Sequence, residues 1–284
     1  MRYDQWLRLR TAINFCYEGP VVGRSTIPFR VPYHSAWLVL EGWAEIETRS
    51  GKARANAGQW LVGGPGLRSQ RFPDSVVLLS LAFLANWPTG NPLFPRGLPV
   101  AFTEQEHPRL LQWARRINRT IDGQLPAHDW FMHAREMPLF SFLKISRHLP
   151  DFLIELTQAL EVCGVTPGVE AELDPRVTCA LDLIESKPLD APFSTAALAD
   201  QSGISLAQLE RLFSTQVGRS PKRQFDLRRL VFAEEALGAP EGRIKEVAHH
   251  LGFASLGHFT RWFRRFHRLS PRQYRQRRGL GGKA

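Results

Sequence analysis

Two arginines, Arg211 and Arg261, occupy matching places in a pattern that the sequence contains twice, 50 residues apart. A guanidinium group is a rigid fork of N–H donors, which can bond to the O6 and N7 atoms of guanine or to phosphate oxygens. A base contact selects a DNA sequence, whereas a phosphate contact adds affinity and salt dependence without selection. Because arginine is the commonest reader of guanine, we expect base contacts at both positions, with phosphate contacts as the alternative.

The pattern around these arginines predicts two helix-turn-helix units. Each copy starts after a turn glycine and continues with a capping serine, an amphipathic helix and a Ser-Pro pair that starts the next helix. The first copy consists of Ser205, Leu209, Arg211, Phe213 and Ser220-Pro221, and the second of Ser255, Phe259, Arg261, Phe263 and Ser270-Pro271. Two such units indicate a protein that puts two helices into DNA.

Helical spacing separates an apolar face from a polar face in each copy. The apolar stripes are Leu209, Leu212 and Phe213 in the first copy and Phe259, Trp262, Phe263 and Phe266 in the second. The residues outside them are Ala207, Gln208, Glu210, Arg211 and Ser214, then Gly257, His258, Arg261, Arg264, Arg265 and Arg268. A membrane-surface helix has the same division, but a bilayer needs the aromatic face free, whereas the repeat needs it for its core. DNA is therefore the preferred partner.

The formal charge of +10 is concentrated in the C-terminal part of the chain. Residues 174–284 hold 19 Lys and Arg against 11 Asp and Glu, whereas residues 1–173 hold 18 against 16. From Arg243 onward there are 11 basic residues and a single acid, Glu246. This asymmetry predicts a polyanionic partner, with a solvated basic tail as the alternative.

Composition favours a two-domain protein of the cytoplasm. With 284 residues, 43% of them hydrophobic, the chain can fill two sizeable cores. The three cysteines are widely spaced and form no C-x-x-C pair, which is typical of reduced thiols. No apolar run resembles a signal peptide within Met1–Arg10, and Val76–Ala85 is too short to span a bilayer as a helix. We expect no membrane partner.

Short strand patterns fill residues 20–86. Ala36–Glu41 and Trp43–Thr48 flank Gly42, Gln59–Val62 runs into a glycine-rich loop, and Val76–Phe83 closes the series. Strands at such intervals predict a barrel or sandwich. The stretch 33–70 resembles the cupin-type barrel at the front of many AraC-family regulators, with His34 ahead of Leu38–Gly42 and later Gly58–Val62. Metal-dependent cupins use several histidines, but Ala36 stands where a second would be, so we expect neither a metal nor catalysis.

A ligand pocket is the remaining role for the barrel. Aromatic side chains supply apolar surface, and an arginine and a histidine could orient a polar effector. The candidates are Arg30, Tyr33, His34, Trp37, Trp43 and Trp60. The alternative is that the aromatic residues are barrel core, because the pattern does not say which side of a strand faces inward.

Helical spacing begins at Glu106 and predicts helices within about 106–163, the second of them from Asp151 to Cys163. These helices would form a dimer interface, or pack only against their own barrel. The turn-rich segment 166–173, with Thr166-Pro167-Gly168, is the expected linker. The predicted domains are therefore 1–165 for sensing and dimerisation and 174–284 for DNA binding.

Four C-terminal segments resemble the AraC/XylS family signature: Ile244–Ala248, Gly252–Ser255, Phe259–Arg265 and Ser270–Arg275. The resemblance covers residues 174–284 and implies seven helices. Two helix-turn-helix motifs, at about 194–215 and 243–266, would be joined by a central helix at about 221–237, stopped at Gly238-Ala239-Pro240, with both recognition helices in successive major grooves.

The resemblance also assigns roles to residues. Base-facing positions fall on Ala207, Glu210 and Arg211 in the first motif and on Gly257, His258 and Arg261 in the second. Gln208 belongs with them, although the Ser205-x-x-Gln208 capping box competes for its side chain. Phosphate contacts are expected for Arg264, Arg265, Arg268, Arg272 and Arg275.

The sequence thus predicts an α+β protein of two domains, an N-terminal cupin-like β-barrel with accessory helices and an all-α C-terminal domain. Its predicted function is sequence-specific transcription regulation, with activation the commoner outcome in resembling proteins. Expected partners are promoter DNA, RNA polymerase, a small-molecule effector and a second copy of the chain, with no cofactor. The alternatives are a non-specific architectural DNA-binding protein and a cupin enzyme fused to a DNA-binding domain.

Overall fold

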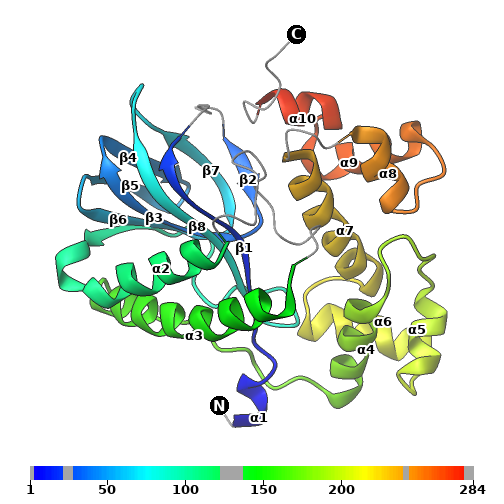
Figure 1. Ribbon diagram of the computed structural model, residues 1–284. Helices are drawn as coiled ribbons and strands as arrows, with labels where there is room; N and C mark the ends of the chain where they lie inside the picture. The colour runs from blue at the N-terminus through cyan, green and yellow to red at the C-terminus, as the bar shows by residue number, and fades with distance from the viewer. Residues whose placement is uncertain (1–2, 22–27, 122–136, 239–242, 278–284) are drawn as a thin grey trace. The chain divides into compact units, whose positions relative to one another are not determined.

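The computed structural model describes residues 3–21, 28–121, 137–238 and 243–277 (Figure 1). The chain divides into two compact units. The first unit is made chiefly of Met1–Asn86 and Pro92–Val169, and the second chiefly of Trp87–Asn91 and Glu170–Gln276. The predicted stop at Ala239-Pro240 lies outside the described residues.

Two antiparallel sheets form the frame of the first unit. Five strands pair in the order β1-β8-β3-β6-β9 and four in the order β2-β7-β4-β5. The strands are β1 (Arg10–Pro20), β2 (Phe29–Val31), β3 (His34–Glu41), β4 (Trp43–Thr48), β5 (Gly51–Asn56), β6 (Gln59–Gly63), β7 (Gly66–Arg71), β8 (Val77–Asn86) and β9 (Pro99–Thr103). The expected β-rich front is confirmed. Gly42 turns between β3 and β4 with φ +81°, a conformation that favours glycine.

Alternate side chains of the strands fill the space between the two sheets. Trp37, Val39, Ile46 and Leu61 belong to this cluster, and all four are buried. Each large apolar side chain buried in this way stabilises the unit by ~1.5–3 kcal/mol. The inter-sheet core therefore fixes which side of each strand faces inward.

Two helices, α2 (Pro108–Ile121) and α3 (Leu139–Val162), lie along the five-stranded sheet (Figure 1). The ring of Phe152 on α3 meets the ring of Phe83 on β8 edge-on, with 5.7 Å between centroids. Two shorter elements, α1 (Tyr3–Trp6) and the 3-10 turn η1 (Glu104–Glu106), complete the described helical structure of this unit.

The predicted start of α3 was wrong. The sequence placed it at Asp151, but the helix begins at Leu139 and holds Pro150 within it. The ring nitrogen of Pro150 cannot donate to the carbonyl of Ser146. Both residues are exposed, so water can replace that hydrogen bond and the helix continues.

His34, at the start of β3, is fully buried on the face of the sheet that the helices cover. Its ring stacks on Phe83 with 5.2 Å between centroids and meets Phe94 edge-on at 5.5 Å. Its Nε2 atom lies 3.4 Å from the carbonyl oxygen of Phe94. Burial among these rings lowers the pKa of His34 to about 4.

The second unit contains seven described helices, as expected. They are α4 (Pro175–Ser186), α5 (Thr195–Gln201), α6 (Leu206–Gln216), α7 (Pro221–Gly238), α8 (Ile244–His250), α9 (Leu256–His267) and α10 (Pro271–Arg277). One core joins α4, α5 and α6 to Phe225 of α7, and a second joins α8, α9 and Tyr274 of α10 to Leu230 of α7. Helix α7 therefore contributes to both cores. None of the described helices is long and apolar enough to cross a membrane.

The turn glycines of the two helix-turn-helix units share a conformation but not an environment. Gly203 has φ +68° and Gly252 has φ +69°. A Cβ on Gly203 would meet no heavy atom within 4 Å, whereas one on Gly252 would lie 2.3 Å from the carbonyl oxygen of Asp190. The second turn is thus packed against the loop between α4 and α5.

Lowering the pH should destabilise the first unit through His34. The ordinary pKa of 6.5 falls to about 4 in the native state, so between these values the unfolded chain takes up a proton that the folded chain excludes. The stability is present above pH 6.5 and is lost as the pH falls towards 4. Relative to His34→Phe, the unchanged chain should lose about 2 kcal/mol of unfolding free energy between pH 7.5 and 5. Urea unfolding measures this, and equal losses would contradict it.

Alanine at the two turn glycines should separate backbone strain from steric overlap. Gly203→Ala meets only the left-handed conformation, which costs about 1–2 kcal/mol. Gly252→Ala also meets the backbone of Asp190, so it should lower the unfolding free energy by about 2 kcal/mol more. Urea unfolding of the two variants compares them. A Gly203→Ala loss equal to that of Gly252→Ala would show that the second turn is not tightly packed.

Candidate DNA-binding surface

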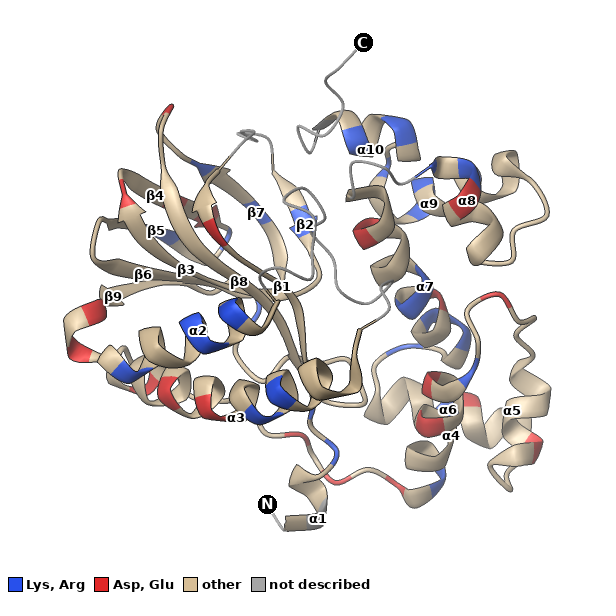
Figure 2. Ribbon diagram, in the orientation of Figure 1, with Lys and Arg blue, Asp and Glu red and all other residues tan. Residues whose placement is uncertain are grey.

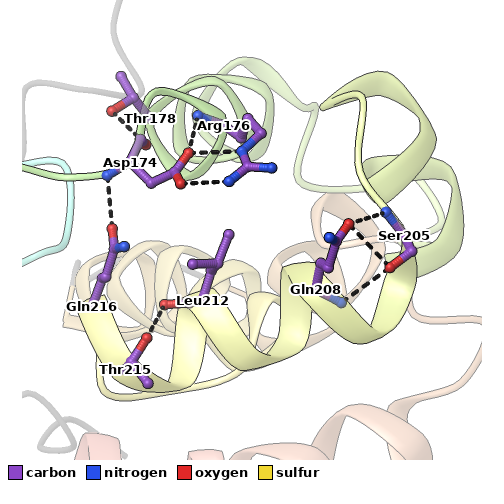
Figure 3. A network of polar contacts seen from close by, with 8 residues as sticks. All are labelled: Asp174, Arg176, Thr178, Ser205, Gln208, Leu212, Thr215 and Gln216. Carbon is purple, nitrogen blue, oxygen red and sulfur yellow. Dashed lines mark hydrogen bonds and ion pairs between the residues drawn. The ribbon is translucent and has the colours of Figure 1, made fainter.

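Helix α6 begins with the predicted capping box (Figure 3). The Ser205 hydroxyl accepts a hydrogen bond from the Gln208 backbone N–H at 3.3 Å, and the Gln208 side-chain oxygen accepts one from the Ser205 backbone N–H at 3.2 Å. Leu209, Leu212 and Phe213 are buried beneath the helix. The residues predicted to face bases are all exposed, namely Ala207, Gln208, Glu210 and Arg211. The side-chain oxygen of Gln208 serves the cap, as its position in the box implies.

The other end of α6 is tied to the start of α4. The Gln216 side-chain oxygen accepts from the Asp174 backbone N–H at 2.8 Å (Figure 3). Asp174 caps α4 by accepting from the Arg176 backbone N–H, and it also pairs with the Arg176 guanidinium at 2.7 Å. The hydrogen bonds from Arg176 lower the pKa of Asp174 to about 2. Helix α6 is therefore held at both ends.

Helix α9 has the same construction. The Ser255 hydroxyl accepts from the His258 backbone N–H at 3.2 Å, and Phe259, Trp262 and Phe263 are buried. The Trp262 indole N–H donates to the carboxylate of Asp226 on α7 at 3.3 Å. This anchoring leaves the three predicted base-facing positions of α9 exposed, Gly257, His258 and Arg261.

The predicted phosphate contacts continue this exposed surface. Figure 2 shows Lys and Arg without Asp or Glu along α9 and α10, whereas α4 and α6 carry both signs. Arg264, Arg265, Arg268 and Arg272 are exposed, and Arg275 is half-buried. Arg268 ends α9 in the left-handed conformation with φ +56°. The second motif and the helix behind it are therefore the more cationic part of the surface.

Two exposed leucines were missed by the sequence reading. Leu206 and Leu256 are the first residues of α6 and α9, and their side chains are 43% and 47% exposed. They stand 50 residues apart, so the same repeat that revealed Arg211 and Arg261 could have found them. An apolar side chain at this position can contact a thymine methyl group.

The side chains predicted for an effector pocket are not on one face. Trp37 belongs to the inter-sheet core, whereas His34 is buried on the helix-covered side of the same strand. Trp60 is also fully buried and pairs with Leu38, which alternates with Trp37 along β3. It therefore faces the same side as His34.

The other three candidates lie further out. Trp43 precedes the inter-sheet residue Ala44, so its ring faces away from the core, where the Arg54 guanidinium covers it at 4.0 Å. Arg30 is exposed and Tyr33 is half-buried.

A buried arginine that the sequence reading passed over lies between the sheets. Arg68 is 2% exposed, and its guanidinium lies 5.4 Å from the ring centre of Trp37. A Cβ on Gly63 would lie 2.4 Å from Arg68 Nη1, so that glycine leaves room for the guanidinium. Its neighbour Leu67 is 47% exposed. Because this order reverses the usual alternation of buried apolar and exposed polar residues, no pattern indicated Arg68.

Comparisons with known proteins bear on the second unit. The matching family model is described as a helix-turn-helix domain and covers residues 198–277. The HTH-type transcriptional activator RhaS of Escherichia coli O157:H7 (strain EC4115 / EHEC) is 39% identical over 82 residues, which are 29% of this chain and 30% of RhaS. The chain thus matches less than a third of the length of that relative.

Two solved structures are also similar. One is a transcriptional regulator with an AraC-type DNA-binding domain from Chromobacterium violaceum, 32% identical over 38% of this chain and 96% of that one, with a TM-score of 0.33. The other is ToxT from Vibrio cholerae, 13% identical over 95% of this chain and 98% of that one, with a TM-score of 0.46. Residues 198–277 of the second unit therefore match a helix-turn-helix domain, and the chain is similar in sequence to the transcriptional activator RhaS over 82 residues.

Proposed function

We propose that this protein is a sequence-specific, DNA-binding transcription regulator that reads DNA with α6 and α9. The observation that supports this most directly is the repeated construction of the two helices. Each has a serine cap, a buried apolar stripe and an exposed face that presents an arginine in the same register, Arg211 and Arg261. A helix fixed in this way presents the same side chains to every groove it enters.

The length of the connecting helix agrees with two grooves on one side of the duplex. Helix α7 has 18 residues, which is about 27 Å at ~1.5 Å per residue. Successive major grooves are ~34 Å apart. The helix and the motifs at its two ends together can bridge that distance, with one recognition helix in each groove.

The two motifs divide the work unequally. Helix α6 carries one arginine and one glutamate, whereas α9 and α10 carry arginines and no acid. Phosphate neutralisation supplies affinity and salt dependence. The second motif and α10 therefore provide much of the affinity, while α6 contributes more to the choice among sites.

The first unit is assigned effector sensing and the regulation of DNA binding. The support for sensing is the resemblance of residues 33–70 to the cupin-type barrel of AraC-family regulators, and Trp37 with the Arg68 guanidinium beside it is the proposed aromatic and cationic pair of this unit. Activation is the proposed outcome, with RNA polymerase as a partner, in line with the name of the relative RhaS. Dimerisation through α2 and α3 completes the proposal.

Selection of bound duplexes from a random library tests this function. The proposal predicts a motif of two half-elements about 10 base pairs apart. Enrichment of no sequence, with binding that depends only on salt, would indicate an architectural protein instead.

Alanine at each repeated arginine should distinguish contacts that select a DNA sequence from contacts that only add affinity for DNA. Arg211→Ala should weaken binding to the selected site about tenfold or more while leaving random duplexes nearly unaffected, because a base contact contributes ~1–3 kcal/mol. Arg261→Ala should weaken the selected site similarly. Arg264→Ala, our comparison, should weaken all duplexes and reduce the salt slope by about one. Fluorescence anisotropy across salt concentrations measures these effects. If Arg211→Ala and Arg264→Ala lose the same affinity on selected and random duplexes, with the same salt dependence, the assignment of Arg211 to a base and of Arg264 to a phosphate is refuted.

The exposed leucines should matter for binding and not for folding. Leu256→Ala should weaken binding to the selected site about fivefold, because it removes an apolar contact of roughly 1 kcal/mol. Its unfolding free energy should change by less than about 0.5 kcal/mol, as for other exposed positions. Leu67→Ala is the matched control, since both side chains are 47% exposed and Leu67 lies in the first unit. Equal affinities for the two variants would exclude the leucine contact.

A further inference from the structure

The side chain of Arg229 lies where the two helix-turn-helix motifs meet. It projects from the middle of α7 and donates from Nε to the carbonyl oxygen of Leu189 at 2.7 Å. From Nη2 it donates to the carbonyl oxygen of Leu251, also at 2.7 Å. Leu189 lies in the loop before α5, and Leu251 ends α8. One guanidinium thus joins the loop that leads into the first motif to the turn of the second.

Aromatic rings and two backbone segments enclose this guanidinium. Its central carbon lies 5.1 Å from the ring centre of Phe225, in the core of the first motif, and 5.2 Å from that of Phe253, in the turn of the second. Close by, Gly252 touches the backbone of Asp190 so tightly that a Cβ would overlap it. Burial lowers the pKa of Arg229, and the negative charges of Asp226 and Asp190 oppose that shift. We call this region, from Leu189, Asp190, Arg229, Leu251, Gly252 and Phe253, the junction.

The neighbouring residue of α7 offers a contrast. Arg228 donates to the carbonyl oxygens of Ile184 and Lys187 and pairs with Glu185 at 3.1 Å. These groups belong to α4 and the residue after it, so the bonds hold α7 to α4 alone. Of these two adjacent arginines, Arg228 therefore bonds only to α4 and the residue after it, whereas Arg229 bonds to two segments that are far apart in the chain.

We infer that Arg229 is a positioning residue that fixes the angle and distance between α6 and α9, and thereby the spacing of half-elements that the protein accepts in DNA. The inference rests on the proposed function. It names a property that the base-facing residues cannot supply, because each of them touches only its own groove. Neither half-element alone contains the spacing, so its selection has to come from the rigidity of the protein between the motifs.

The geometry of DNA makes this rigidity measurable. Each base pair inserted between two half-elements moves one away from the other by ~3.4 Å and turns it by ~34–36° about the duplex axis. A flexible connection follows that change, whereas a locked one loses contacts in one groove. A lysine at position 229 keeps the charge but has no planar fork, so it cannot hold two carbonyl oxygens and stack between two rings at once.

The test uses the full chain and duplexes carrying the sequence selected by the unchanged protein. Dissociation constants are measured at the selected spacing and with one base pair added or removed, for the unchanged protein, Arg229→Lys and the control Arg228→Lys. We expect the unchanged protein and Arg228→Lys to lose about tenfold or more in affinity when the spacing changes, within the usual range of coupling between sites. Arg229→Lys should bind the selected spacing more weakly and discriminate between spacings by less than about threefold.

A purely structural role for Arg229 gives a different result. In that case Arg229→Lys melts earlier but, while folded, keeps the spacing preference of the unchanged protein, and the inference is overturned. If Arg229→Lys does not fold, Phe253→Leu replaces it, since it removes one ring from the guanidinium and keeps both carbonyl bonds. It should reduce the spacing preference, and an unaltered preference overturns the inference. If the unchanged protein binds a duplex with one added base pair as tightly as the selected duplex, the inference is overturned and no variant is needed. Failure of the proposed function is distinct, because no sequence would then be selected.

Discussion

The burial of one apolar stripe on each of α6 and α9 is the constraint on which the second unit depends. Phe259, Trp262 and Phe263 are buried in the core beside α7. Because Arg261 and the arginines that follow it lie on the opposite side of the same helix, they are exposed to solvent. The same holds for α6. Folding and the display of DNA-binding groups are therefore one event, and α7 is the element that both cores share.

The first unit is held together by two buried layers, one on each face of its five-stranded sheet. Its two sheets enclose one core between them, and α2 and α3 cover a second buried face. Because successive side chains of a strand face opposite sides of the sheet, His34 and Trp37, three residues apart on β3, lie in separate environments. Arg68 is the polar exception in the inter-sheet core, and its position beside Trp37 gives that core a chemical character that an all-apolar interior would lack.

The features predicted correctly from the sequence are those that depend on residues close together in the chain. The caps at Ser205 and Ser255 and the strands around Gly42 follow from spacing and turn chemistry within short windows, whereas the seven helices were implied by the family resemblance. The start of α3 was missed because Pro150 is tolerated only where solvent meets the freed carbonyl, and exposure is a tertiary property. For the same reason, the sequence did not show which side chains of each β-strand face the core. The role of Arg229 depends on bringing Leu189 and Leu251 together from positions far apart in the chain, which no periodicity reports.

The central claim is that α6 and α9 read bases in two major grooves, and methylation interference at guanine N7 tests it most directly. A methyl group at N7 blocks a major-groove contact without altering the phosphates. On the selected duplex, the account predicts interference at guanines in two clusters about 10 base pairs apart on one face of the DNA. Interference in a single cluster, or binding that no methylated guanine disturbs, would contradict it.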